Sequence, residues 1–448
     1  MKKILLGILL IISLTCAMRD WQFNFGFRAT IFNLLEILFI LSFLIYSTGR
    51  QFKFAIKKKQ LQLISFFIIW IIIVLIGDII SIIFPISDYS INQSVKGILI
   101  TLLTEVFFIT LVIFFNTLKP EEQKKIIKYF VFGVIVSALY SYVNFYSMKV
   151  TGKNLDSKIW PMVSYHYVFT DKSDRFDMIF RLHGVTGGPN PQALYILLIL
   201  PILTGSFFLK KSTKLLVLLF ILYIAFFFTL SRSSILALFI ILIPFIFSVI
   251  KKRRTFKIVV SFMLILIPML LLAYHYWDDI SIILKSRQFF EDSNRMKIYQ
   301  HAFDLFLSHP LGVGFNNYSA YRLFLYGQFS QPNAHNSWLT LLAEDGIQGL
   351  IFYILYFLFF LKATFKSRSP IAIPYRYSLI GIIIAVTFNN TLSLFFVQYF
   401  IILFFLFINS DTEFDFFIRK RALKSVSVSP NPGHLKLEST NPLAGASG

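Results

Sequence analysis

Uninterrupted apolar runs recur along the whole chain and restrict what it can fold into. Each is about 15–20 residues long, close to the length that crosses a hydrocarbon core of about 30 Å as an α-helix. The composition agrees, because 56% of the 448 residues are hydrophobic and 15% are charged, whereas soluble domains have roughly 25% charged residues. A water-soluble enzyme and a disordered protein are therefore excluded, and the predicted fold is an all-α polytopic membrane protein.

The apolar runs between polar breaks predict about twelve transmembrane helices in a single membrane domain, residues 1–409. Residues 410–448 are expected to form a cytoplasmic tail, disordered from about residue 425, because that stretch is polar and rich in Ser, Pro, Gly and Asn. The predicted spans are residues 4–18, 30–47, 63–87, 97–117, 129–147, 192–209, 215–230, 235–250, 258–275, 346–361, 377–391 and 394–409.

The positive charge of the chain, formally +21, is distributed unevenly among the polar breaks. If the N-terminus is cytoplasmic, 28 of the 43 Lys and Arg residues fall in cytoplasmic segments. Lys and Arg in short loops resist translocation, so this bias predicts that both termini are cytoplasmic. Two long loops, residues 148–191 and 276–345, then lie on the external face. Most of the charge thus reflects topology, and no nucleic-acid partner is expected.

The topology rule leaves several external arginines unexplained. Arg232 stands between two apolar runs, in the short break Ser231-Arg232-Ser233-Ser234. An arginine in so tight a turn between spans is a candidate for function, although its side chain could also extend to the lipid headgroups. The external arginines are Arg19, Arg28, Arg175, Arg181, Arg232, Arg287, Arg295 and Arg322.

The second external loop contains a stretch that is typical of an amphipathic helix near the membrane surface. Ser293 or Asn294 is a suitable N-cap, which places Arg295 in the first turn. His309-Pro310 ends the stretch, because proline cannot continue a helix. The apolar positions at helical spacing are Ile298, Ala302, Leu305 and Phe306.

Two motifs on the external face occur in a fixed order. Arg232 and Leu236 fit the pattern Arg-x3-Leu. His335-Asn336, followed after nine residues by Gly346 and Gly349, fits His-[Asn/Ser/Gln]-x9-Gly-x2-Gly. With the intervening segment from Arg295, these motifs, within residues 180–360, resemble the O-antigen ligase and polymerase superfamily of integral-membrane glycosyltransferases.

The resemblance implies a reaction at the external face of the bacterial cytoplasmic (inner) membrane. The donor would be a glycan on undecaprenyl diphosphate, held among membrane lipids, and the acceptor would be a sugar. Ligases of the superfamily use lipid A–core as the acceptor. Polymerases use the next lipid-linked repeat unit and make O-antigen, capsule or exopolysaccharide. The family reaction needs no metal and no cofactor.

The resemblance also assigns expected roles. Arg232 and Arg295 would act as catalytic cations, because guanidinium groups bind phosphate oxygens and stabilise the charge that grows on a leaving diphosphate. His335 would accept the proton of the acceptor hydroxyl, since its ordinary pKa is near neutrality. Direct attack would invert the anomeric carbon. The expected substrate-binding residues are Arg181, Asn336 and Arg322, and the structural motif residues are Leu236, Gly346 and Gly349.

Three other readings of the sequence stay open at this stage. A repeat-unit polymerase shares both motifs with the ligase. The form of the motifs slightly favours the ligase. A transporter or flippase for lipid-linked glycans would need charges inside the spans, where the main cases are Asp78 and Glu105, with Glu36 near a span end. The shape-type peptidoglycan polymerases have a catalytic loop pattern that the sequence does not contain.

Overall fold

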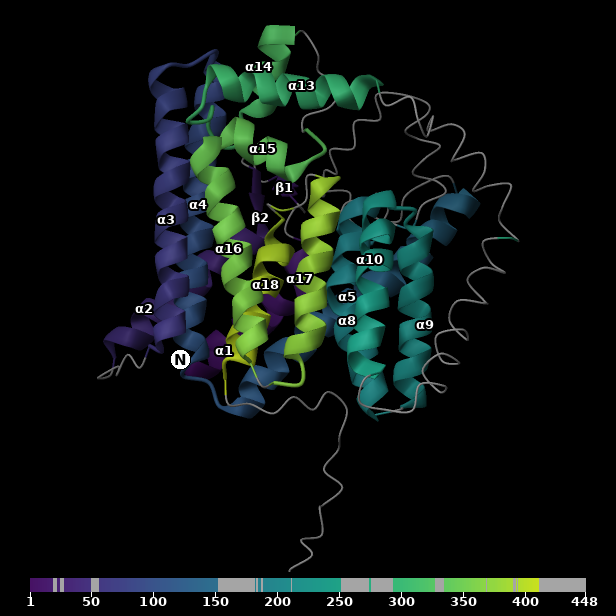
Figure 1. Ribbon diagram of the computed structural model, residues 1–448. Coiled ribbons are helices and arrows are strands. Elements are labelled where there is room, and N and C mark those ends of the chain that lie inside the picture. The colour runs from purple at the N-terminus through teal and green to yellow at the C-terminus, as the bar shows by residue number, and fades with distance from the viewer. Residues whose placement is uncertain are drawn as a thin grey trace, which may run out of the picture. The chain divides into compact units, whose positions relative to one another are not determined.

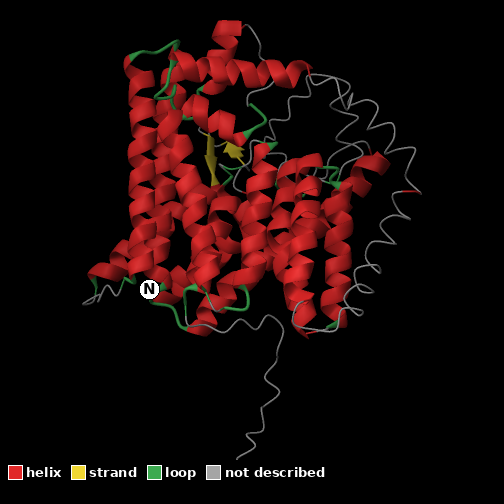
Figure 2. Cartoon of the chain, in the orientation of Figure 1, coloured by secondary structure: helices red, strands yellow, loops and turns green. Residues whose placement is uncertain are grey.

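The computed structural model is helical throughout the residues that it describes, apart from one short strand pair. The described residues all lie within Met1–Phe414, and Figure 2 shows their helices, strands and loops in colour. They are residues 1–18, 22–24, 28–49, 56–151, 182, 184–186, 188–210, 212–250, 274, 293–326, 334–367, 369–389, 392 and 394–410.

Fourteen α-helices form within these residues, which confirms the helical class. One departure is a small antiparallel ribbon of β1 (Gln22–Asn24) and β2 (Arg28–Thr30), in which Phe23 lies opposite Ala29. A single 3₁₀ turn, η1 (Cys16–Met18), precedes the ribbon. The helices are α1 (Lys2–Thr15), α2 (Ile31–Thr48), α3 (Lys58–Ile83), α4 (Asp88–Phe115), α5 (Pro120–Thr151), α8 (Pro189–Lys210), α9 (Thr213–Phe228), α10 (Arg232–Ile250), α13 (Ser293–Ser308), α14 (Tyr318–Tyr326), α15 (Ser337–Glu344), α16 (Gly346–Lys366), α17 (Ala372–Thr387) and α18 (Phe395–Ile408).

Five of the described helices are long and apolar enough to cross a membrane: α3, α4, α5, α8 and α16. Shorter apolar helices lie within α2, α9, α10, α17 and α18. The chain is therefore a multi-pass membrane protein. The predicted span at residues 258–275 falls almost wholly outside the described residues, so the number of twelve spans stays a prediction.

The predicted boundary between the third and fourth spans is wrong. Helix α3 ends at Ile83 rather than at residue 87, and α4 begins at Asp88, well before residue 97. Pro85 lies in the break and has no N–H to donate to a helix. Ser87 then starts α4, because its side chain accepts a hydrogen bond from the Ser90 N–H. The prediction followed apolar runs alone and therefore placed the start of α4 too late, since the first turns of α4 are polar.

Helix α17 also begins earlier than predicted, at Ala372 instead of residue 377. Pro374 is tolerated there because it lies within the first turn, where backbone N–H groups have no partner in the helix. Arg376, which we assigned to the preceding loop, is part of the helix and donates from Nε to the Thr364 hydroxyl at 3.1 Å.

Helix α18 forms the core of the described helices. Its sequence is apolar on every side, and all of its residues except Gln398 are buried. A helix that is apolar on every side is either enclosed by others or faces lipid, and α18 is enclosed, since it contacts α4, α5, α8, α16 and α17. Phe395 stacks on Phe108 of α4, with ring centroids 5.4 Å apart. This packing fixes the helices on which the candidate site is built.

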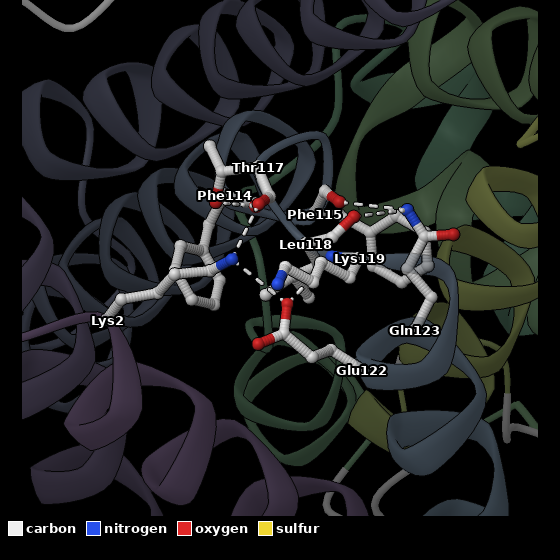
Figure 3. Close-up of polar contacts among 8 residues, drawn as sticks. All are labelled: Lys2, Phe114, Phe115, Thr117, Leu118, Lys119, Glu122 and Gln123. Atoms are coloured by element: carbon white, nitrogen blue, oxygen red, sulfur yellow. Dashed lines mark hydrogen bonds and ion pairs between the residues drawn. The ribbon is translucent and has the colours of Figure 1, made fainter.

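One end of the described helices gathers several breaks that the charge rule assigns to the cytoplasm. Lys2 of α1 donates to the Thr117 carbonyl at 2.8 Å and forms an ion pair with Glu122 at 3.0 Å (Figure 3). Lys59 of α3 donates to the Asn409 side chain, which follows α18, at 2.7 Å. Breaks that were predicted to share one side of the membrane therefore do meet at one end of the structure.

Helices α13, α14 and α15 form a small module at the other end of α3 and α16 (Figure 1). The predicted helix is confirmed, because α13 spans Ser293–Ser308 and three of its four predicted apolar positions, Ile298, Ala302 and Leu305, are buried. Tyr318 donates through its hydroxyl to the Ile298 carbonyl at 2.8 Å, which ties α14 to α13. The buried cluster of this module comprises Ile298, Ala302, Leu305, Val313, Tyr318, Tyr321, Ala334 and Ala343.

Candidate functional site

Arg232 is the first residue of α10 and follows a strained turn. Helix α9 ends at Phe228, and Leu230 then has a φ of 50°, which is unusual for a side chain of its size. The backbone N–H of the buried Ser231 is satisfied within the turn, since it donates a hydrogen bond to the Thr229 hydroxyl at 3.3 Å. The turn holds Arg232 half-buried at the start of the helix.

Leu236 lies one turn after Arg232, on the same face of α10. Its side chain is 44% exposed, so in the described structure it contributes little to the core. The Arg-x3-Leu spacing thus places a cation and an apolar side chain side by side on the outer part of one helix.

His335 immediately precedes α15 and also has a left-handed backbone, with a φ of 50°. Such a conformation costs about 1–3 kcal/mol in a non-glycine residue, and it often marks a functional site. Asn336 is the N-cap of α15, because its side-chain oxygen accepts from the N–H groups of Trp338 and Leu339 at 2.9 and 3.2 Å. His335 is therefore held, half-buried, at the start of a capped helix.

The two motif glycines allow the backbone to pack closely where α15 meets α16. Gly346 has a φ of 68°, and a Cβ there would lie 2.5 Å from the Pro310 carbonyl oxygen. The neighbouring Ile347 N–H donates to that same oxygen at 3.1 Å. A Cβ on Gly349 would lie 2.4 Å from the Cβ of Asp345. Gly346 thus accommodates the loop that follows α13.

Three buried carboxyl groups surround this junction. The Glu344 carboxylate accepts from the Tyr318 N–H at 3.2 Å, and burial raises its pKa to about 8. Burial also raises the pKa of Asp345 well above its ordinary value. Asp78 of α3 accepts from the Phe315 N–H at 2.8 Å, which fastens the loop to a long helix. Within the described residues, no three His, Cys, Asp or Glu side chains are grouped closely enough to hold a metal ion.

Of the remaining predicted arginines, Arg322 is described with its side chain and Arg295 by its backbone position alone. Arg295 lies in the first turn of α13, as predicted, although its side chain is outside the described part. Arg322 on α14 is 2% exposed, with its guanidinium 5.9 Å from the centre of the Tyr318 ring. Arg181 is outside the described residues. Its neighbour Leu182 donates to the Phe228 carbonyl at 2.9 Å, so that segment reaches the turn before Arg232.

The structure brings the two motif helices together through a residue that the sequence did not single out. Asn389, just after α17, donates from its side chain to the Ser233 hydroxyl of α10. Its backbone carbonyl accepts from the Ser337 hydroxyl of α15 at 2.7 Å. In sequence, Asn389 was only the polar end of an apolar run, and no spacing rule relates it to either motif.

The helices and this junction define a class, a multi-pass membrane protein in which Asn389 links the helix that begins with the arginine motif to the helix that follows the histidine. Residues 216–354 match the family model described as O-antigen ligase. Over these residues the chain carries an O-antigen ligase domain, which is typical of membrane enzymes of the ligase or polymerase type of glycosyltransferase. The matched range includes Arg232, Arg295 and His335, and it excludes Arg181. No curated protein matches the chain.

Proposed function

We propose that the protein is a metal-independent, inverting glycosyltransferase that moves a glycan from undecaprenyl diphosphate to an acceptor sugar on the external membrane face. The observation that carries the proposal is the junction at Asn389, because it joins the helix that starts at Arg232 to the helix that follows His335. Both helices lie within the range of the family match.

Arg232 and Arg295 supply positive charge to the leaving diphosphate. As the glycosidic bond breaks, negative charge grows on the phosphate oxygens, and fixed guanidinium groups stabilise it without reorganisation. Both residues lie at the first turn of a helix, Arg232 in α10 and Arg295 in α13. Helix N-termini carry partial positive charge from their backbone N–H groups, which favours an anion further.

His335 accepts the proton from the acceptor hydroxyl as that oxygen attacks the anomeric carbon. The bond to the diphosphate breaks on the opposite face, the electron pair leaves with the phosphate oxygen, and the configuration inverts. The strained backbone of His335 and the Asn336 cap hold the ring at a fixed place relative to α15. Arg181, Arg322 and Asn336 are assigned to substrate binding in this proposal.

The test is transfer from a synthetic undecaprenyl-diphosphate-linked glycan by purified protein in lipid. Arg232→Ala or Arg295→Ala is expected to lower the transfer rate by about 100- to 1,000-fold, as for other groups that stabilise a transition-state charge. His335→Ala is expected to lower it by about 100- to 10,000-fold. Full activity in all three variants would refute the proposed roles.

Two matched controls distinguish a loss of the chemical step from a loss of folding or membrane insertion. Arg376→Ala removes a half-buried arginine at the far end of α17, where the guanidinium lies over the Phe365 ring. His309→Ala removes a half-buried histidine that packs against Tyr321 in the same external module. Both variants should insert in the membrane and transfer at close to the wild-type rate.

We further propose lipid A–core as the acceptor, with the bacterial inner membrane as the location. The alternative acceptor is the next lipid-linked repeat unit, which would make the protein a polymerase of O-antigen, capsule or exopolysaccharide. Offering each acceptor separately to the same preparation distinguishes the two, since only the acceptor that is used gives a longer product. No cofactor is included in either reaction.

The transporter reading is less well supported. Asp78, one of the two main charges on which that reading depends, lies near the end of α3, is fully buried and accepts a hydrogen bond from the Phe315 backbone. That contact gives Asp78 an anchoring role. A transporter would move the intact donor across vesicles without forming a new glycosidic bond, which the transfer assay detects directly.

A further inference from the structure

The contacts of Asn389 link four segments that are far apart in the sequence. Its side-chain oxygen accepts from the Asn190 amide of α8 at 3.3 Å. Its side-chain nitrogen donates to the Ser233 hydroxyl of α10, and its carbonyl accepts from the Ser337 hydroxyl of α15 at 2.7 Å. The same Ser337 oxygen accepts from the Leu392 N–H at 3.3 Å, which closes the network onto the segment before α18.

The contacts of Asn389 with Ser233 and Ser337 are buried, whereas its contact with Asn190 is partly buried. Asn389 is 8% exposed, Ser233 is 7% exposed and Ser337 is 1% exposed. Buried polar groups that lose their partners cost free energy, so a satisfied network of this kind holds its members in one arrangement. A second tie reinforces it, since the Trp338 indole N–H donates to the Thr387 hydroxyl of α17 at 3.0 Å.

The network acts at the starts of the two motif helices. Ser233 follows Arg232 directly, and Ser337 lies two residues after His335. The turn before each helix contains a strained residue, Leu230 in one case and His335 in the other. Since strained turns relax unless the surrounding structure holds them, the bonds to Asn389 fix both turns and hence the separation of the two motif residues.

We propose that Asn389 is a positioning residue, which sets Arg232 and His335 at their working separation by holding Ser233 of α10 and Ser337 of α15. The inference rests on the proposed function, because the working separation is that between the leaving diphosphate and the acceptor hydroxyl. Asn389 itself touches neither substrate. Its effect is on the rate of the chemical step and not on the binding of the donor.

The test compares kcat and KM for the lipid-linked donor in variants of the full protein. Asn389→Ala and Ser337→Ala are expected to lower kcat by about 10- to 100-fold, because small misplacements of reacting groups have effects of this size. The KM for the donor should stay within about twofold of wild type, since the loss falls on the transition state. Ser233→Ala combined with Asn389→Ala should lose no more than Asn389→Ala alone, as for groups in one network.

Ser378→Ala is the matched control. Its side chain is fully buried on α17, the helix that Asn389 follows, and the hydroxyl donates to the Leu198 carbonyl of α8 at 2.7 Å, away from both motif turns. Ser378→Ala should lose about as much thermal stability as Ser337→Ala and keep the wild-type kcat. Equal kcat losses in Ser378→Ala and Ser337→Ala, a loss confined to KM, or additive losses in the double variant would overturn the inference.

The wild-type protein and Arg232→Ala are assayed in parallel. Wild-type transfer that Arg232→Ala abolishes and Asn389→Ala leaves intact would refute the positioning role and leave the proposed function standing. No transfer by the wild-type protein with either acceptor would refute the proposed function, and the positioning role with it.

Discussion

At the scale of single residues, the carboxyl groups between α15 and α16 depend on burial for their charge state. Glu344 is 6% exposed and Asp345 is 1% exposed, and neither forms an ion pair in the described part of the chain. Ionising a carboxyl without a nearby cation in such surroundings is unfavourable. Burial at this junction therefore raises the pKa of both groups and favours their neutral forms.

The raised pKa of Glu344 predicts that stability falls as the pH rises. Its pKa changes from 4.5 to about 8 on folding. The folded protein therefore binds more protons than the unfolded chain between these values, so stability declines across this window and levels off above it. Glu344→Gln keeps an acceptor for the Tyr318 N–H and cannot ionise. Its melting temperature in detergent should fall less than that of wild type between pH 5 and pH 8. An equal fall would contradict a titrating Glu344.

At the scale of elements, α15 is a short helix whose N-terminus carries the histidine motif. Eight residues are too few for a helix to be stable alone. It depends on the Asn336 cap and on burial of Leu341 and Ala343 in the module. The cap also explains why asparagine or serine suits the second position of the motif, since both are preferred N-caps.

The cap predicts a pattern of substitutions at Asn336. Asn336→Ala should lower the free energy of unfolding by about 1 kcal/mol, and Asn336→Ser should nearly preserve it. Chemical denaturation in detergent measures the stability, and the transfer assay measures the consequence for His335. If Asn336→Ser is stable but inactive, the amide has a role in binding substrate beyond the cap, as the resemblance implies.

At the scale of the whole membrane unit, the positions of the lysines and the hydrogen bonds between helix ends agree. Lys2 and Lys59 both bond to other segments at one end of the helices, where the charge rule placed the cytoplasm. Two helix ends that meet in this way must lie on the same side of a membrane. The orientation of that end is a prediction of the charge rule alone.

Cysteine labelling tests the orientation. Cys16 is fully buried, so a Cys16→Ser background is expected to fold and to give no signal. In intact cells, a membrane-impermeant maleimide should label Leu307→Cys on the exposed side of α13, which is 62% exposed in the structure. Lys58→Cys, exposed at the start of α3, should react only after the membrane is permeabilised. The reverse pattern would invert the proposed topology.

The sequence by itself determined the class of fold and the residues of the two motifs. Long apolar runs can only be helices in lipid, because every backbone polar group must then be bonded within the segment. The helix at Ser293–Ser308 was also predictable, since its apolar spacing and its His309-Pro310 ending are local signals, although it begins at Ser293, so that neither Ser293 nor Asn294 is its N-cap. Helix boundaries that lie in a polar first turn, as in α4, could not be predicted from the apolar runs.

Only the tertiary structure decided how the motifs meet. Asn389 lies 156 residues from Ser233 and 52 from Ser337, and its bonds to them exist only once α10, α15 and α17 have packed. The same holds for Gly346, whose need for a glycine comes from the loop at Pro310. Local signals fix what a segment becomes, whereas contacts between distant segments depend on the packing of the whole chain. That packing places Asn389 beside the starts of both motif helices, next to Arg232 in one and close to His335 in the other.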